Sequence, residues 1–339
     1  MKLLSLILIL ILLLELPLLP LVKTSSQPIK IAVSLGVFVP VVRDIGGTFV
    51  NVFSIVPPGV EPHEFTLTPG IIQNVSLANL IIIDGHIEWE TQLLNAVAQA
   101  KGQNIDTFSL NLMNYASNMT ILNMPPGSGM TGKSFHGYWL LPSNMEIIAK
   151  LIYDKLIKLD PAHSDYYYSN LNTFLNRLSL VENKLSEIKN KLGGKPVVLG
   201  FLEEYYIAHA MGLKVVTVLS AGENPNANPN ALSLAEQVLS KEQGIIMISD
   251  VAEQMPLYAT AKQLSQQTGA PLVKVITTID EDYVSAMMYN IGEVDGVINT
   301  AKVNSQSQTI DPMFILLIGL VIIIVVETFY IFKLRRLVR

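Results

Sequence analysis

The chemistry that this sequence could carry centres on a histidine held in a proline-rich segment. His63 closes the segment 57–63 (PPGVEPH), which directly follows the alternating apolar residues of a strand predicted over 50–56. Because proline fixes its own φ angle and restrains the residue before it, this segment would hold the imidazole with little backbone entropy left to lose. A rigidly held imidazole suits a metal ligand or a polar recognition site, whereas the simpler interpretation is a surface turn that carries a histidine by chance.

Other histidines follow predicted elements in comparable positions. His136 lies in the aromatic run FHGYWLLP, just before a helix predicted over 143–159. His86 follows the apolar strand predicted at 80–83 and is a less certain candidate, because a loop histidine bonded to backbone is the simpler interpretation. His209 lies in the middle of a predicted helix and is not expected to bind a metal.

Carboxylates in the second half of the chain could complete a metal site with these imidazoles. The candidates are Glu203, Glu204, Asp280 and, less certainly, Glu281. They follow strands predicted over 197–199 and 272–279. Imidazole and carboxylate together suit a divalent first-row metal such as Zn²⁺, Mn²⁺ or Fe²⁺. The sequence has no cysteine, which excludes thiolate ligands and disulfides.

The elements that must position these residues alternate between strand and helix. This alternation predicts an α/β fold with two lobes, 28–160 and 194–298, each with a mostly parallel sheet flanked by helices. One long helix within 161–192, with apolar residues at steps of three and four, would join the lobes. Ligands gather at the carboxyl ends of parallel strands, so His63 and His86 are expected at the same edge of the first sheet.

The two ends of the chain have the composition of membrane-targeting segments. The apolar segment 1–26 is interpreted as a signal peptide or an N-terminal anchor. The apolar run 312–332 is long enough for a single transmembrane helix, and the basic tail 333–339 would then lie in the cytosol. A polar linker is predicted over 299–311. These segments would hold the body of the protein at the extracellular face of the cell membrane.

Four segments of the chain carry a resemblance to a known family. They are DIGG at 44–47, VPPGVEPH at 56–63, LDPAH at 159–163 and MMYN at 287–290. Together they are similar to the solute-binding proteins of ABC transporters that capture zinc, manganese or iron. The resemblance implies a receptor, not an enzyme, that delivers its ion to a permease with a cytosolic ATPase. It also implies that His63 and His136 are the first two ligands and that His163 has a structural place at a helix start.

The second lobe departs from the pattern of that family. A gapless match places Phe201 at the third ligand position and Ile276 at the fourth, and neither side chain can bind a metal. Glu203 or Glu204 would substitute after a shifted turn, and Asp280 would be reached by a longer strand. Two histidines with carboxylates suit zinc, manganese or iron, whereas three histidines would favour zinc more strongly.

Two other functions stay open from the sequence. A family member that has lost its metal would bind another ligand or a cell-surface partner. A surface metallohydrolase would use His63, His136 and a carboxylate to hold zinc and activate water, but the sequence has no HExxH or other compact catalytic motif. The net charge of −5 and the lack of basic clusters outside the tail argue against nucleic-acid binding.

Overall fold

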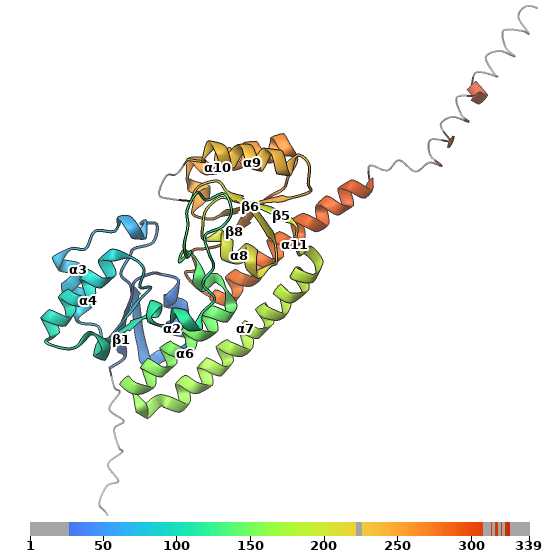
Figure 1. Ribbon diagram of the computed structural model, residues 1–339. Coiled ribbons are helices and arrows are strands. Elements are labelled where there is room, and N and C mark those ends of the chain that lie inside the picture. The colour runs from blue at the N-terminus through green and yellow to red at the C-terminus, as the bar shows by residue number, and fades with distance from the viewer. Residues whose placement is uncertain are drawn as a thin grey trace, which may run out of the picture.

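The protein consists of two α/β lobes that lie along one long helix (Figure 1). This computed structural model describes residues 27–221, 226–307 and seven residues between 313 and 325. Each lobe contains a four-stranded parallel sheet. The two-lobed fold predicted from the strand–helix alternation is therefore confirmed.

The first lobe has the strand order β2-β1-β3-β4. The central strand β3 is an apolar run that is entirely buried, as a parallel strand covered by helices on both faces must be, whereas the edge strand β2 is partly exposed. The strands are β1 (Ile29–Val33), β2 (Val50–Ser54), β3 (Leu80–Ile83) and β4 (Ser109–Asn111). The helices are α2 (Phe38–Gly46), α3 (Pro69–Ser76), α4 (Glu88–Lys101), α5 (Ile105–Phe108) and α6 (Pro142–Leu159).

The second lobe repeats this arrangement with the order β6-β5-β7-β8. In each sheet the lobe's first strand lies between its second and its third strand. The second strand is therefore at one edge of the sheet and the fourth strand at the other. The strands are β5 (Pro196–Leu199), β6 (Lys214–Val218), β7 (Ile245–Ser249) and β8 (Leu272–Val275). The helices are α8 (Glu204–Ala210), α9 (Pro229–Leu239), α10 (Pro256–Thr268) and α11 (Tyr283–Ser307).

The long helix α7 (Ser164–Leu192) connects the lobes and packs against both. Its 29 residues span about 40 Å at the usual rise per residue. Its buried side chains recur every three or four positions and face α2 and α6 of the first lobe and α11 of the second. One continuous hydrophobic core therefore runs through both lobes, and it includes Phe174 of α7 and Tyr283 of α11.

An arginine on α7 also bridges the two lobes. Arg177 donates hydrogen bonds of 2.8 and 2.7 Å to the two carboxylate oxygens of Asp282, just before α11. Its guanidinium lies 3.5 Å from the Asp44 carboxylate on α2. Although partial burial opposes it, the Arg177 contact holds the pKa of Asp282 below its usual range. The pKa of Asp44 is instead raised, because burial and the Asp282 charge outweigh Arg177.

Several predicted boundaries are wrong, and tertiary hydrogen bonds account for one of them. Strand β8 ends at Val275 and not at residue 279, because the Asn290 side chain bonds both the N–H and the C=O of Ile276. Helix α11 runs on to Ser307 and so covers most of the predicted linker 299–311. The three-residue strand β4 was not predicted.

The expected membrane-targeting segments lie largely or wholly outside the described residues. The predicted signal or anchor at 1–26 and the basic tail at 333–339 are not described. Of 312–332, seven residues are described, and all seven are helical, apolar and exposed. Within the described residues, no helix is long and apolar enough to cross a membrane. The C-terminal anchor therefore stays a prediction.

Candidate metal centre

His63 is held in a short 3₁₀ turn, η2 (Pro62–Glu64), in the loop that follows β2. The Glu61 side chain caps this turn by accepting a 3.2 Å hydrogen bond from the His63 N–H. From α4, the Trp89 indole N–H donates to the Pro62 carbonyl oxygen over 2.8 Å. Two hydrogen bonds thus hold the backbone at Pro62 and His63, while His63 itself stays exposed to solvent.

His86 lies in the turn that follows β3, and this turn is organised by a buried glutamate. Glu90 of α4 accepts hydrogen bonds from the N–H groups of Asp84, Gly85 and Ile87 over 2.7 to 3.3 Å. Gly85 has a φ of +98°, and a Cβ there would approach the Asn111 side chain to 2.1 Å, so glycine is required. Burial and the neighbouring Asp84 charge raise the pKa of Glu90 to about 7.

His136 follows a segment of the first lobe that crosses to the second, here called the crossing segment (residues 119–135). Figure 1 shows it in green, beside β6 and β8. The Tyr206 hydroxyl of α8 accepts from the Leu122 N–H (3.0 Å) and donates to the Ser134 carbonyl (2.5 Å). A Cβ at Gly137 would lie 2.8 Å from the Glu203 carbonyl oxygen. The second lobe therefore supports the backbone on both sides of His136.

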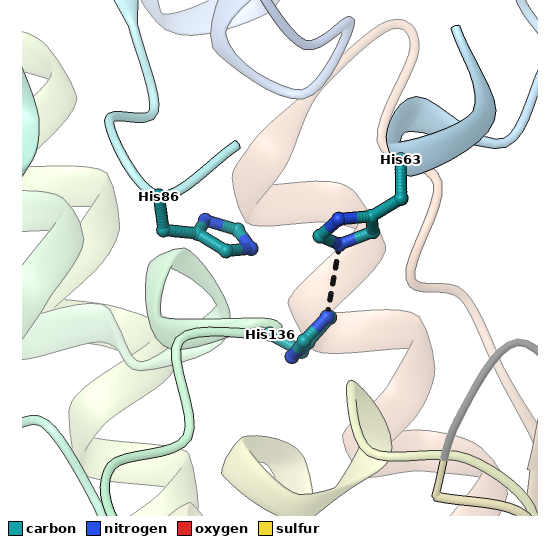
Figure 2. A group of neighbouring side chains, drawn as sticks. All are labelled: His63, His86 and His136. Atoms are coloured by element: carbon teal, nitrogen blue, oxygen red, sulfur yellow. Dashed lines mark hydrogen bonds between the residues drawn. The ribbon is translucent and has the colours of Figure 1, made fainter. Parts of the chain in front are cut away.

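The three imidazoles converge from these separate loops (Figure 2). One ring nitrogen of each of His63, His86 and His136 lies within 4.8 Å of the others. The Nε2 atoms of His63 and His136 are 3.0 Å apart. A tetrahedral zinc ion separates two imidazole nitrogens by about 3.4 Å, given Zn–N bonds of about 2.0–2.1 Å. Small side-chain adjustments would therefore give the spacing of a three-histidine zinc site.

The environment keeps one of these imidazoles neutral and favours the charged form of another. Burial, followed by the charges of His86 and His63, lowers the pKa of His136 to about 4. Burial also opposes protonation of His86, but contact with Asp84 and the charges of Glu90 and Glu203 outweigh it, so the pKa of His86 is raised. His136 therefore offers a free lone pair at neutral pH.

Glu204 has a structural role in the second lobe. Its buried carboxylate accepts hydrogen bonds from the N–H groups of Gly200 (2.6 Å), Phe201 (3.1 Å) and Ser249 (2.6 Å). It thus joins the ends of β5 and β7, much as Glu90 braces the turn after β3 in the first lobe. Burial raises its pKa to about 8. These backbone contacts explain why Glu204 is not directed at the histidines.

The other predicted carboxylates do not join the group of histidines either. Among the described residues, the metal-compatible group contains His63, His86 and His136 and includes none of Glu203, Glu204, Asp280 and Glu281. Asp280 and Glu281 are exposed, in the irregular stretch after β8. The shortness of β8 accounts for the position of Asp280, because the strand that was expected to carry it ends at Val275. Of these carboxylates, Glu203 is the one whose charge helps to raise the pKa of His86.

The structure thus brings His63 and His136 together, as predicted, but completes the group with His86. The sequence did contain a sign of this, since His86 directly follows a strand and faces the same sheet edge as His63. His163 lies elsewhere, with its Nδ1 atom 2.6 Å from Asp160 and its ring stacked on Phe49. His209 is an exposed residue of α8.

Comparison with known proteins identifies the family. The family described as "Zinc-uptake complex component A periplasmic" (ZnuA) matches residues 31–295. The chain belongs to this family. The resemblance inferred from the four sequence segments is therefore confirmed.

Individual relatives are distant but cover most of the chain. A metal ABC transporter substrate-binding lipoprotein of Lactococcus lactis subsp. lactis is 24% identical over 289 residues, which cover 80% of this chain and 88% of the relative. The manganese ABC transporter substrate-binding lipoprotein PsaA of Streptococcus anginosus is 24% identical and covers 80% and 89%. A crystal structure of ZnuA matches with a TM-score of 0.65 at 19% identity, covering 80% of this chain and 99% of that chain.

Proposed function

We propose that this chain captures a divalent metal ion outside the cell and passes it to an ABC importer. The observation that carries this proposal is the convergence of His63, His86 and His136 at one edge of the first-lobe sheet. Membership of a family described by zinc uptake supports it. The partners would be a membrane permease and a cytosolic ATPase, as the transporter names of the relatives suggest.

Zinc is the ion that this site would prefer. Three imidazole nitrogens with one open position form a common zinc arrangement, whereas manganese and iron(II) are better served by more oxygen ligands. The fourth position would be taken by water or by a carboxylate. Glu203, whose charge acts on His86, is the second-lobe residue that we propose for it. Mn²⁺ and Fe²⁺ would bind more weakly.

The apolar run 312–332 would hold the receptor at the outer face of the membrane. The relatives are named lipoproteins, whereas this sequence has no cysteine that could carry a lipid. The described residues of the run, such as Leu316 and Ile323, are helical and expose more than half of their surface, as lipid-facing residues would. The basic residues of 333–339 would lie in the cytosol.

Calorimetric titration of the full-length protein in detergent tests the proposal. After chelator treatment, the protein should bind one zinc ion per chain, and manganese and iron(II) more weakly. His63→Ala, His86→Ala and His136→Ala should each weaken zinc binding strongly. His209→Ala, which changes an exposed histidine outside the group, is the matched control and should bind zinc as the parent does.

Two results would contradict this proposal in different ways. Failure to bind any of the three metals would remove the metal-receptor function and favour a member that has lost its ion. Full zinc affinity in His86→Ala, with loss in Asp280→Ala, would restore the ligand set of two histidines with second-lobe carboxylates.

A further inference from the structure

A buried carboxylate directly behind His86 lacks the hydrogen bonds that such a group normally has. The Asp84 side chain is completely buried, and its Oδ2 atom contacts His86 Nδ1. Neither oxygen accepts a regular hydrogen bond from any part of the chain that the structure describes. A buried carboxylate without hydrogen bonds is costly, and the fold would not retain it without compensation. The imidazole of His86 is the group that this carboxylate faces.

The backbone of Asp84 is held firmly, so the placement of its carboxylate is determined by the fold. The Asp84 N–H donates to Ser34 Oγ and to Glu90 Oε1, both over 2.9 Å. The Tyr138 hydroxyl donates to the Asp84 carbonyl oxygen over 3.5 Å. Asp84, which directly follows β3, is thus fixed by contacts with three neighbouring segments.

We propose that Asp84 is a positioning residue that orients His86 for metal binding and fixes its tautomer; this inference rests on the proposed function. The contact with Asp84 requires that His86 Nδ1 carry the proton. The Nε2 lone pair then points away from Asp84, and Figure 2 shows the ring directed towards His63 and His136. A carboxylate that bonds the far nitrogen of a ligating histidine also makes that histidine a stronger ligand.

The charge of Asp84 adds a second contribution. Three neutral imidazoles bring no negative charge to a divalent cation, and the second-lobe carboxylates lie outside their group. Asp84 places a negative charge one imidazole away from the ion, in a buried environment where electrostatic interactions are only weakly screened. The first lobe therefore supplies part of the charge that the expected second-lobe carboxylates would have provided.

Zinc affinity in a double-mutant cycle tests the inference. Asp84→Ala should lower the zinc affinity of the full-length protein about 10–100-fold, the usual effect of losing such a partner. Asp84→Asn keeps the size and one acceptor oxygen but removes the charge, so it should lose less than Asp84→Ala. In a His86→Gln background, Asp84→Ala should cause no further loss, because Asp84 acts through His86.

The tautomer of His86 gives a readout that a purely structural role would not change. In ¹⁵N-histidine-labelled parent protein without metal, at about pH 8, His86 should carry its proton on Nδ1. Its signals are identified by their loss in His86→Gln. In Asp84→Ala a population with the proton on Nε2 should appear, and thermal unfolding confirms that the variant is folded.

The outcomes separate this inference from the proposed function. An Nε2 proton on His86 in the parent, or an equal affinity loss from Asp84→Ala with and without His86, would overturn the role of Asp84. If Asp84→Ala does not fold, the tautomer of His86 in the parent protein and the zinc affinity of Asp84→Asn still test the role of Asp84. If the parent binds no zinc, the proposed function fails, whereas the metal-free tautomer still tests the Asp84–His86 pair.

Discussion

The surroundings of His86 and His136 shift the pKa values of these two imidazoles in opposite directions. The pKa of His136, lowered to about 4 chiefly by burial, leaves its imidazole neutral above about pH 5. The pKa of His86 is raised, because the carboxylates of Asp84, Glu90 and Glu203 outweigh the effect of burial. A metal ion therefore competes with a proton at His86 at a higher pH than it does at His136.

This difference predicts how zinc affinity depends on pH. Zinc binds only the neutral imidazole, so affinity should fall as the pH drops through the raised pKa of His86. His136 should add no pH dependence until the pH approaches its value of about 4. Calorimetry in buffers with different ionisation enthalpies measures the protons released on binding. His86→Gln should release fewer protons than the parent near pH 6.5, about the usual histidine pKa. Equal release in both proteins would disprove this assignment.

Glu204 provides a contrast between a structural carboxylate and a ligand. Glu204→Gln should lower the free energy of unfolding by about 1–3 kcal/mol, because a buried N–H of Gly200, Phe201 or Ser249 loses its acceptor. Zinc affinity should stay unchanged. Thermal unfolding and zinc titration of the same preparation measure both quantities. A large affinity loss without destabilisation would instead make Glu204 a ligand.

The crossing segment is the element that links the metal site to the second lobe. It belongs to the first lobe by sequence, but Tyr206 of α8 bonds it at Leu122 and at Ser134, two residues before His136. At the middle of the segment, a Cβ on Gly127 would approach the Thr217 side chain of β6 to 2.1 Å. The close packing of this segment on β6 and α8 therefore determines where His136 lies.

Removing the Tyr206 hydroxyl should loosen this link. Tyr206→Phe takes away one acceptor and one donor from the crossing segment, which leaves the Leu122 N–H and the Ser134 carbonyl without their partner. Zinc should then dissociate several-fold faster, because part of the about 1 kcal/mol lost with each of the two hydrogen bonds would weaken zinc binding. Stopped-flow exchange with a chelator measures this rate. Tyr205→Phe, at the neighbouring residue that does not bond these two groups, is the control and should exchange zinc as the parent does.

The sequence predicts the elements better than it predicts how their ends meet. Buried strands such as Leu80–Ile83 are apolar runs, and the stripe of α7 repeats every three or four residues, so both can be recognised locally. The end of β8 depends instead on Asn290, fourteen residues beyond Ile276. The use of Glu204 as a backbone acceptor depends on Ser249, forty-five residues away. Such contacts between distant segments account for why Asp280 and Glu204 lie outside the group of three histidines.

Across the whole molecule, the lobes are held by the shared core and by Arg177. Replacing Arg177 with methionine would leave the carboxylates of Asp44 and Asp282 close together without their cation. Because all three side chains are partly exposed, we expect a loss of only about 1 kcal/mol in the free energy of unfolding. Arg177→Lys should recover part of it, since lysine keeps the charge but not the two-bonded geometry.

The pH dependence of this effect follows from Asp282. Its pKa is held below the usual value, so its contribution is present above the unfolded value and is lost as the pH falls through the folded one. The stability difference between the parent and Arg177→Met should therefore shrink in acid. Chemical denaturation at several pH values measures it. A difference that grows in acid would assign the effect to another group.

All three histidines come from the first lobe, and this limits how far a bound ion could shift the arrangement of the two lobes. A ligand shifts a conformational equilibrium only by the difference in its affinity for the two states. An ion that contacted the first lobe alone would bind an open and a closed receptor equally well, and a permease could not distinguish full from empty by the lobe arrangement. The crossing segment removes this equality, because His136 is held by Tyr206 of the second lobe. The hydroxyl of one tyrosine thus ties the position of a candidate ligand of the first lobe to the second lobe.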